Sequence, residues 1–299
     1  MRDASIADVT LVRTLVALVR AMRPRQWLKN GFVVAPAVFA GHAFDPPALL
    51  RVGAAAGLFC LASSAVYLVN DVMDREADRC DPVKRYRPIA AGELSVHVAL
   101  VAAVLLASAA VALGTTLGRG VLTALGIYLG LNLTYSLGGK LVVVLEAMLL
   151  ATGFVVRLAA GALAIDAEIS HWLLICGFLL ALLLAFGKRV PEVSHPTSRT
   201  PRYPAAFLTE AVTLLAGVTL VAYVLYTVAP DTQAKIHSRA LLITAPVVLF
   251  GILRYLFLLT REGSQDPTAA LLADRPLLVT VVVWTVLAGV IVAQAGGHP

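Results

Sequence analysis

The stretch GAAAGLFCLASSAVYLVNDVMDREAD, at residues 53–78, decides the fold of this chain. Its first part is almost wholly apolar and is long enough to cross a bilayer as a helix, which takes about 20 residues. Its second part is strongly polar and contains Asn70, Asp71, Asp74 and Asp78. The whole chain is apolar, because 59% of its 299 residues are hydrophobic, 14% are charged and the mean hydropathy is +0.85. Such a composition excludes a water-soluble globule and indicates an integral membrane protein.

Charge-poor runs of spanning length recur along the chain and predict an all-α, polytopic bundle of about nine transmembrane helices. The expected helices lie at roughly 30–44, 48–69, 97–115, 119–137, 142–163, 171–187, 206–229, 239–259 and 276–295. Together they form one transmembrane domain over residues 30–299. Residues 1–29 are expected to form an amphipathic segment in the membrane interface, because apolar residues fall near one helical face and Arg13 and Arg20 on the other.

Lysine and arginine are distributed unevenly between alternate loops. Most of the 24 basic side chains fall in the N-terminal segment and in the loops on its side of the membrane. Since cytoplasmic loops carry the excess of Lys and Arg, the N-terminus and the clustered charges are predicted to face the cytoplasm. The sequence pI near 9.4 then reflects attraction to anionic membrane lipids and requires no nucleic acid as a partner.

The polar end of the opening stretch has the spacing of a metal site. On a helix, Asp71, Asp74 and Asp78 fall close to one stripe. Carboxylates so close together repel one another unless a cation holds them. Oxygen ligands suit Mg²⁺, for which Mn²⁺ is expected to substitute, bound by one or two carboxylates together with substrate phosphates. The predicted metal ligands are Asn70, Asp71, Asp74 and Asp78. The alternative is a solvated helix end, in which acidic residues pair with arginines such as Arg75.

Two motifs resemble a known family. NDVMDREAD at 70–78 is similar to the first aspartate-rich motif of the UbiA superfamily of intramembrane prenyltransferases, and YSLGGK at 135–140 resembles its Tyr-Ser-x-x-x-Lys segment. The resemblance implies nine helices around a cavity that opens to the cytoplasmic face, with Asp71, Asp74 and Asp78 as catalytic residues.

Ordinary members of this superfamily carry a second acidic motif after the sixth helix. The corresponding stretch here is AFGKRVPEVSH at 185–195, in which Lys188 and Arg189 replace the expected aspartates and Glu192 alone is acidic. The change predicts cations that bind an anion instead of carboxylates that bind a metal. The alternative is a pair of basic side chains that snorkel at the end of a helix.

This exchange, together with RPRQWLKN at 23–30, KRYRPIAAG at 84–92 and DPTAALLADRPL at 266–277, is similar to one branch of the superfamily. That branch transfers 5-phosphoribosyl from phosphoribosyl pyrophosphate (PRPP) to a polyprenyl phosphate, decaprenyl phosphate, and releases diphosphate. Its product, decaprenylphosphoryl-5-phosphoribose, supplies arabinan for the arabinogalactan and lipoarabinomannan of bacterial cell walls. The resemblance therefore implies a bacterial plasma membrane enzyme.

These substrates bring three phosphate-bearing groups to one site, which requires basic patches beside the acidic face. The predicted phosphate-binding residues are Lys84, Arg85, Arg87, Lys140, Lys188 and Arg189. The resemblance adds further substrate-binding residues, namely Lys29, Asn30, Asn70 and Tyr135. Within the predicted fifth helix, Glu146 and Arg157 are costly in lipid and are expected to face a cavity or a polar partner.

Two other functions remain open from the sequence. One is an aromatic or quinone prenyltransferase that uses an isoprenyl diphosphate, and the other is a transporter or channel for an anionic solute. The transporter is disfavoured because the charges gather on one face and no pair of short, broken helices occurs at the midplane. Arg254, near a helix end, either snorkels or reaches the site. The sequence also leaves the oligomeric state open, a homo-oligomer included.

Overall fold

The computed structural model describes residues 2–168, 170–193, 203–236, 239–261 and 267–296, and every regular element in these ranges is a helix. The all-α prediction is therefore confirmed. The elements are α1 Arg2–Met22, η1 Pro24–Val33, α2 Ala35–Phe39, α3 Pro46–Met73, α4 Arg75–Cys80, η2 Lys84–Tyr86, α5 Val96–Gly114, η3 Thr115–Leu117, α6 Arg119–Ser136, η4 Gly139–Leu141, α7 Leu145–Ala164, α8 His171–Gly187, η5 Pro191–Val193, α9 Ala205–Val228, α10 Pro230–Ile236, η6 Ala240–Thr244, α11 Ala245–Leu259, α12 Pro267–Ala273 and α13 Arg275–Gly296. The η elements are 3-10 helices.

Six segments are long and apolar enough to cross a membrane. They are Pro46–Met73, Val96–Leu117, Leu145–Ala164, Ala205–Val228, Ala240–Leu259 and Arg275–Gln294. α8 is apolar but shorter, at 17 residues, and α6 has 18 residues, several of which are polar. The multi-pass character is thus supported, while the count of nine spanning helices and the orientation of the termini stay predictions.

The segment predicted as the first transmembrane helix, 30–44, does not form one α-helix. The chain instead makes the 3-10 helix η1 and then the five-residue helix α2. Pro36 lies in the first turn of α2 and lacks the N–H that would continue an α-helix from η1. Gly41 then turns the chain with a φ of 81°, a conformation that glycine adopts without strain.

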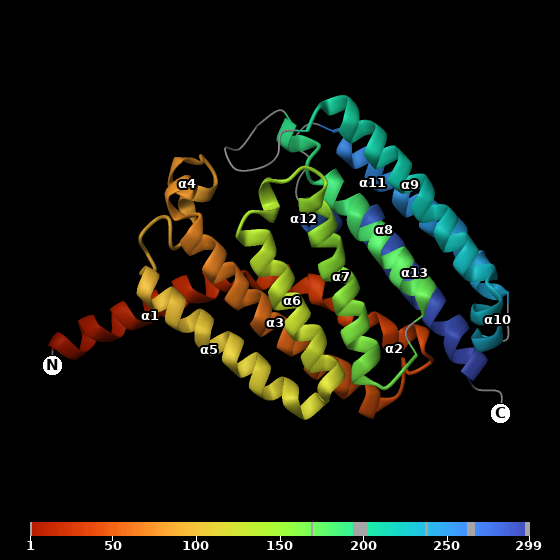
Figure 1. The fold of residues 1–299 in the computed structure, drawn as a ribbon, viewed down its shortest axis with the longest axis horizontal. Helices are drawn as coiled ribbons and strands as arrows, with labels where there is room; N and C mark the ends of the chain where they lie inside the picture. The colour runs from red at the N-terminus through yellow and green to blue at the C-terminus, as the bar shows by residue number, and fades with distance from the viewer. Residues whose placement is uncertain (1, 169, 194–202, 237–238, 262–266, 297–299) are drawn as a thin grey trace.

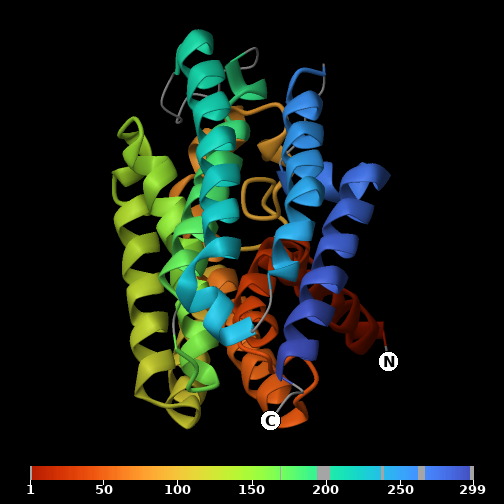
Figure 2. The same ribbon diagram turned by 90° about the vertical axis from the view of Figure 1, so that its right-hand side faces the viewer.

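Helices that follow one another in the chain pack side by side. α3 contacts α5, α6 contacts α7, α7 contacts α8, α8 contacts α9, and α11 contacts α13 (Figures 1 and 2). η1 and α2 lie within this bundle, against α7 and α3. The irregular backbone of η1 is therefore covered by protein, as a segment at membrane depth must be.

Two apolar clusters form most of the core. The first joins α2, α3, α6 and α7 around Phe59 and Leu125, and the second joins α8, α9 and α11 around Leu183 and Leu208. Many buried positions are alanine, which lets helices approach closely in a membrane. The outer sides of α5 and α13 leave valine and leucine side chains exposed, as helices that face lipid would.

α1 has an apolar face that the rest of the protein leaves uncovered. Ala17 and Ala21 are buried in a cluster with residues of α3 and α5. The exposed apolar side chains of this helix are Leu11, Val12, Leu15, Val16 and Val19. This pattern agrees with an amphipathic helix, and the placement of residues 1–29 in the membrane interface stays a prediction.

The charged loops gather at one end of the bundle. α4, the α6–α7 connection and the end of α8 lie together at the upper end in Figure 1. At the opposite end lies the exposed pair of Arg51 and Asp166, whose side chains are 3.3 Å apart. The site therefore lies at the upper end.

Candidate active site

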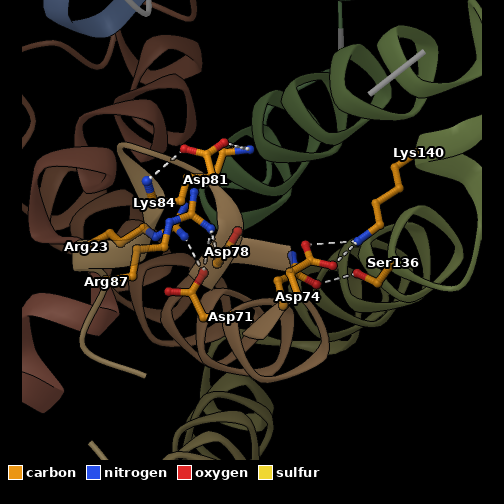
Figure 3. A network of polar contacts seen from close by, with 10 residues as sticks. Arg23, Asp71, Asp74, Asp78, Asp81, Lys84, Arg87, Ser136 and Lys140 are labelled. Carbon is orange, nitrogen blue, oxygen red and sulfur yellow. Dashed lines mark hydrogen bonds and ion pairs between the residues drawn. The ribbon is translucent and has the colours of Figure 1, made fainter. Parts of the chain in front are cut away.

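The acidic motif is divided by a helix break. α3 ends at Met73, Asp74 has non-helical torsions of −94° and 2°, and α4 begins at Arg75. As a result, Asp71 and Asp78 point to one side and Asp74 points to the other (Figure 3). The expectation that the three carboxylates share one stripe is wrong, because it assumed a single continuous helix.

Asp71 and Asp78 are both buried and bind arginines. One guanidinium nitrogen of Arg87 donates to Asp71 Oδ1 at 3.1 Å and to Asp78 Oδ2 at 2.7 Å. Arg23 also donates to Asp71 Oδ1, and its guanidinium lies 5.0 Å from the centre of the Tyr67 ring. Arg23 was not singled out from the sequence. The sequence feature that could have indicated Arg23 is its position directly before Pro24, where the chain leaves α1.

Asp74 and Asn70 face the other side of the motif. Lys140 Nζ donates to both carboxylate oxygens of Asp74, at 2.7 and 3.0 Å, and the Ser136 hydroxyl donates to Asn70 Oδ1 at 2.5 Å. Both partners come from YSLGGK. A Cβ at Gly139 would lie 2.9 Å from a backbone oxygen of α6, so glycine permits the turn that directs Lys140 to Asp74.

Lys84 and Arg85 lie at the edge of the acidic cluster. The Asp81 carboxylate accepts hydrogen bonds from the backbone N–H groups of Val83 and Lys84, each at 2.9 Å. Lys84 Nζ lies 3.7 Å from the same carboxylate. Burial raises the pKa of Asp81, but the two N–H donors and the charge of Lys84 outweigh it and hold that pKa below its usual value. Arg85 is exposed and donates to the Tyr86 hydroxyl at 2.7 Å.

Arg189 and Glu146 form a buried ion pair. Arg189 Nε donates to Glu146 Oε1 at 2.8 Å and a terminal nitrogen donates to Oε2, while the two residues are 5% and 0% exposed. The Tyr203 hydroxyl donates to Glu146 Oε1 at 3.4 Å and accepts from the Val144 N–H at 2.8 Å. Burial raises the pKa of Tyr203. Glu146 thus has the polar partner that was expected for a carboxylate within an apolar helix. Lys188, the residue before Arg189, is exposed.

Arg254 does not join the acidic cluster. Its guanidinium donates to Asp274 at 3.1 and 2.7 Å, and Asp274 also accepts from the Leu277 N–H at 2.9 Å, which caps α13. The hydrogen bonds from Arg254 hold the pKa of Asp274 below its usual value. Arg254 therefore joins α11 to the start of α13.

The remaining predicted site residues lie on η1 and α6. Lys29 and Tyr135 are half-buried. Asn30 is 2% exposed and lies in a hydrogen-bond network with Arg157. The side chain of Glu192 lies outside the described residues. The positions of these side chains do not test the substrate roles assigned to them, and those roles stay predictions.

The acidic motif can supply part of a divalent-cation site. Among the described residues, no three acidic, histidine or cysteine side chains gather into a complete protein site. Asp71 Oδ2, however, is buried and has no hydrogen-bond partner within the described part of the chain. A carboxylate oxygen in that state fits Mg²⁺, which is commonly held by one or two carboxylates and completed by substrate phosphates and water.

A bundle of apolar helices, with buried carboxylates and cations paired at one end, defines a polytopic membrane protein with a polar site at one end of its helices. The chain belongs to the UbiA prenyltransferase family, whose model matches residues 31–295. The resemblance seen in NDVMDREAD and YSLGGK is therefore confirmed.

Known relatives and structures agree with this assignment. The decaprenyl-phosphate phosphoribosyltransferase of Corynebacterium glutamicum is 32% identical over 278 residues, which cover 89% of this chain and 84% of that protein. The enzyme of the same name from Mycolicibacterium smegmatis is 32% identical, with 89% of each chain covered. A UbiA homologue from Archaeoglobus fulgidus, solved with DMAPP and Mg²⁺, has a TM-score of 0.67 at 18% identity over 92% of this chain and 99% of that one, so it shows the fold.

Proposed function

We propose that this protein transfers 5-phosphoribosyl from PRPP to a polyprenyl phosphate, with decaprenyl phosphate as the acceptor, and releases diphosphate. The observation that carries the proposal is the exchange of the second acidic motif for Lys188 and Arg189, of which Arg189 is held by Glu146. The phosphoribosyltransferase names of relatives that match most of the chain support it. The site is assigned to the cytoplasmic face of a bacterial plasma membrane, because the basic loops gather there.

The polar network is suited to exchange partners when a phosphorylated substrate binds. Arg23, Arg87 and Lys140 each hold a carboxylate of the motif in this structure. PRPP would bring a diphosphate at C1 and a phosphate at C5. Cations already at the motif can turn to these groups, which make strong charge-assisted hydrogen bonds, while the carboxylates become available to a metal ion.

The residues assigned to hold metal are Asn70, Asp71, Asp74 and Asp78. Because Asn70 and Asp74 face one side of the motif and Asp71 and Asp78 the other, the two pairs would hold separate ions or come together when the substrate binds. When bound there, Mg²⁺ supplies Lewis-acid stabilisation of the charge that develops on the leaving diphosphate. Oxygen donors alone make up this set, which is the chemistry that Mg²⁺ and Mn²⁺ prefer.

The reaction breaks the bond between ribose C1 and the diphosphate oxygen and forms a bond from C1 to an oxygen of the acceptor phosphate. The acceptor is an anion at neutral pH, so no general base is required. Carboxylates near the sugar stabilise the positive charge that develops on its ring, and cations near the diphosphate stabilise its negative charge.

The other basic side chains are assigned to the remaining phosphates. Lys188 is exposed beside the Glu146–Arg189 pair and is the first choice for the acceptor phosphate, whereas Arg189 would reach a phosphate only by leaving Glu146. The outer cations Lys84 and Arg85 would meet the phosphate on C5. The assignments carried over from the branch resemblance are Lys29, Asn30 and Tyr135.

Product analysis on the purified protein tests the proposal. Labelled PRPP with decaprenyl phosphate should give a labelled lipid, and labelled isoprenyl diphosphate with 4-hydroxybenzoate should give none. Asp71→Asn provides the inactive control. A prenylated aromatic product, with no label transferred from PRPP, would replace this proposal with the prenyltransferase alternative.

A further inference from the structure

Arg157 is a buried cation in the middle of α7. Arg157 is 5% exposed, and no carboxylate pairs with its guanidinium in the described part of the chain. A charge without an ionic partner is costly at membrane depth, where ionisable residues usually have a specific use. The proposed chemistry does not use Arg157, since it lies eleven residues beyond Glu146, a distance of about 16 Å along the helix.

Neutral groups surround its guanidinium. Nε donates to Asn30 Oδ1 at 2.8 Å, and the terminal nitrogens donate to the Gly153 carbonyl at 2.9 Å and to the Tyr128 hydroxyl at 3.0 Å. The guanidinium also lies 4.6 Å from the ring centre of Tyr128 and 5.3 Å from that of Phe154. These dipoles and rings replace water around the charge.

The same face of α7 holds the backbone of η1. One helical turn beyond Arg157, a Cβ on Gly161 would overlap the carbonyl oxygen of Val33 at the end of η1. Asn30, which Arg157 binds, donates in turn to Cys60 Sγ at 3.1 Å on α3. η1 is therefore fixed between α7 and α3 at two neighbouring points.

η1 begins at the site. Its N-cap residue is Arg23, whose φ of 56° and ψ of 62° place it in the left-handed region, which a residue with a Cβ occupies only at a cost. That conformation directs the guanidinium to Asp71. Such strain persists where the surrounding structure holds the chain in place. Here Ser64 of α3 holds both sides of Arg23, because its hydroxyl donates to the Met22 carbonyl at 3.4 Å and accepts from Trp27 Nε1 at 3.1 Å, while Arg157 holds the far end of η1.

We propose that Arg157 is a positioning residue, which fixes η1 so that Arg23 is presented to the acidic motif and to the donor diphosphate. Asn30 is 2% exposed and lies seven residues beyond Arg23, or about 14 Å along a 3-10 helix. In this inference Asn30 anchors η1 to Arg157 and does not contact the donor diphosphate, so Arg157 acts through η1 and not by touching the substrate. The kinetic part of this inference rests on the proposed function.

Two pairs of variants test it in the full-length protein. Arg157→Met removes the guanidinium, and Arg157→Lys keeps the charge and can restore one hydrogen bond to Asn30. Gly161→Ala disturbs the contact with η1 without touching Arg157. Its matched control is Gly153→Ala, on the same face, where a Cβ would lie 3.6 Å from the guanidinium in ordinary contact.

Arg157→Met and Gly161→Ala should each raise the KM for PRPP about ten-fold, as expected when the charge-assisted contact from Arg23 is misplaced. Arg157→Lys should raise this KM less than Arg157→Met does, and Gly153→Ala should leave it unchanged. Loss of folded protein alone would lower the maximal rate and leave KM as it was, which would overturn the proposal.

A second measurement does not depend on the substrate. Amide hydrogen exchange in residues 24–33 should become faster in Arg157→Met and in Gly161→Ala than in the wild type or Gly153→Ala. Unchanged exchange would overturn the positioning role, whatever the substrate proves to be. A wild-type protein inactive with PRPP would instead refute the proposed function, and the exchange data would still decide on Arg157.

Discussion

Removing one partner of the buried Glu146–Arg189 pair should destabilise the protein strongly. In Arg189→Met, the Glu146 carboxylate, which is 0% exposed, loses both hydrogen bonds from the guanidinium, and among the described residues the weak one from Tyr203 at 3.4 Å remains. Leaving one buried charge of a pair unpaired costs about 3–5 kcal/mol. A domain of this size loses about 2–4 °C in Tm per kcal/mol, so the expected fall is roughly 6–20 °C.

The assay is thermal unfolding in detergent, followed by the loss of the monodisperse fraction. The double variant Glu146→Gln/Arg189→Met should recover at least half of the lost Tm, because it no longer leaves a buried charge alone. Lys188→Met is the matched control: it removes the neighbouring, exposed cation and should lower Tm much less than Arg189→Met does, while it raises the KM for the acceptor.

Two results would refute this reasoning. If Arg189→Met keeps the wild-type Tm but loses kcat/KM, Arg189 acts as a phosphate ligand and its pairing with Glu146 has little weight. If the double variant is no more stable than Arg189→Met alone, the loss does not come from the unpaired carboxylate.

Three further predictions follow from the site and the topology. Asp74→Asn should lower Tm only slightly, because the Asn oxygen can still accept from the part-buried Lys140, yet lower turnover about a hundred-fold. EDTA should abolish wild-type activity until Mg²⁺ or Mn²⁺ is restored, and full turnover in excess EDTA would contradict the metal assignment. In a cysteine-free background, Val83→Cys should react with an impermeant maleimide from the cytoplasmic side and Thr116→Cys from outside, and the reverse would contradict the orientation. The pKa of Asp81 is lower in the folded than in the unfolded chain, so its carboxylate stabilises the fold at a pH above its unfolded pKa, and this stabilisation is lost as the pH falls through its folded pKa. The Tm of the wild type should therefore fall more steeply below about pH 4 than the Tm of Asp81→Asn. Parallel curves of Tm against pH would show that the Asp81 carboxylate contributes nothing to stability.

Much of the fold is predictable from the sequence, since apolar length and charge-free runs reflect the thickness of the bilayer. The predicted ranges for the later helices match α5 to α9 within a few residues. The first range failed because hydrophobicity does not distinguish one α-helix from a 3-10 helix that ends at Val33 and is followed by a short α-helix with Pro36 in its first turn. Composition reveals that a segment is apolar but not how its backbone turns.

The candidate site was predictable in its residue types but not in its pairings. The acidic motif and YSLGGK were recognisable, yet the pairing of Asp74 with Lys140 joins residues 66 positions apart, and Arg23 reaches Asp71 across 48 positions. Such contacts depend on how helices pack, which local spacing does not encode. The break at Asp74 was missed for a similar reason, because no proline or glycine marks it.

The fate of a doubly labelled donor tests the central claim most directly. PRPP labelled with ¹⁴C in the ribose and with ³²P in the β-phosphate is incubated with decaprenyl phosphate, Mg²⁺ and the purified protein, and lipid and water phases are then counted separately. The account predicts that ¹⁴C enters the lipid phase, and that ³²P appears in the water phase as free diphosphate, separated from unreacted PRPP by chromatography, in an amount equal to the lipid-bound ¹⁴C. If neither label leaves PRPP, and labelled isoprenyl diphosphate is consumed under the same conditions, the protein is not a phosphoribosyltransferase.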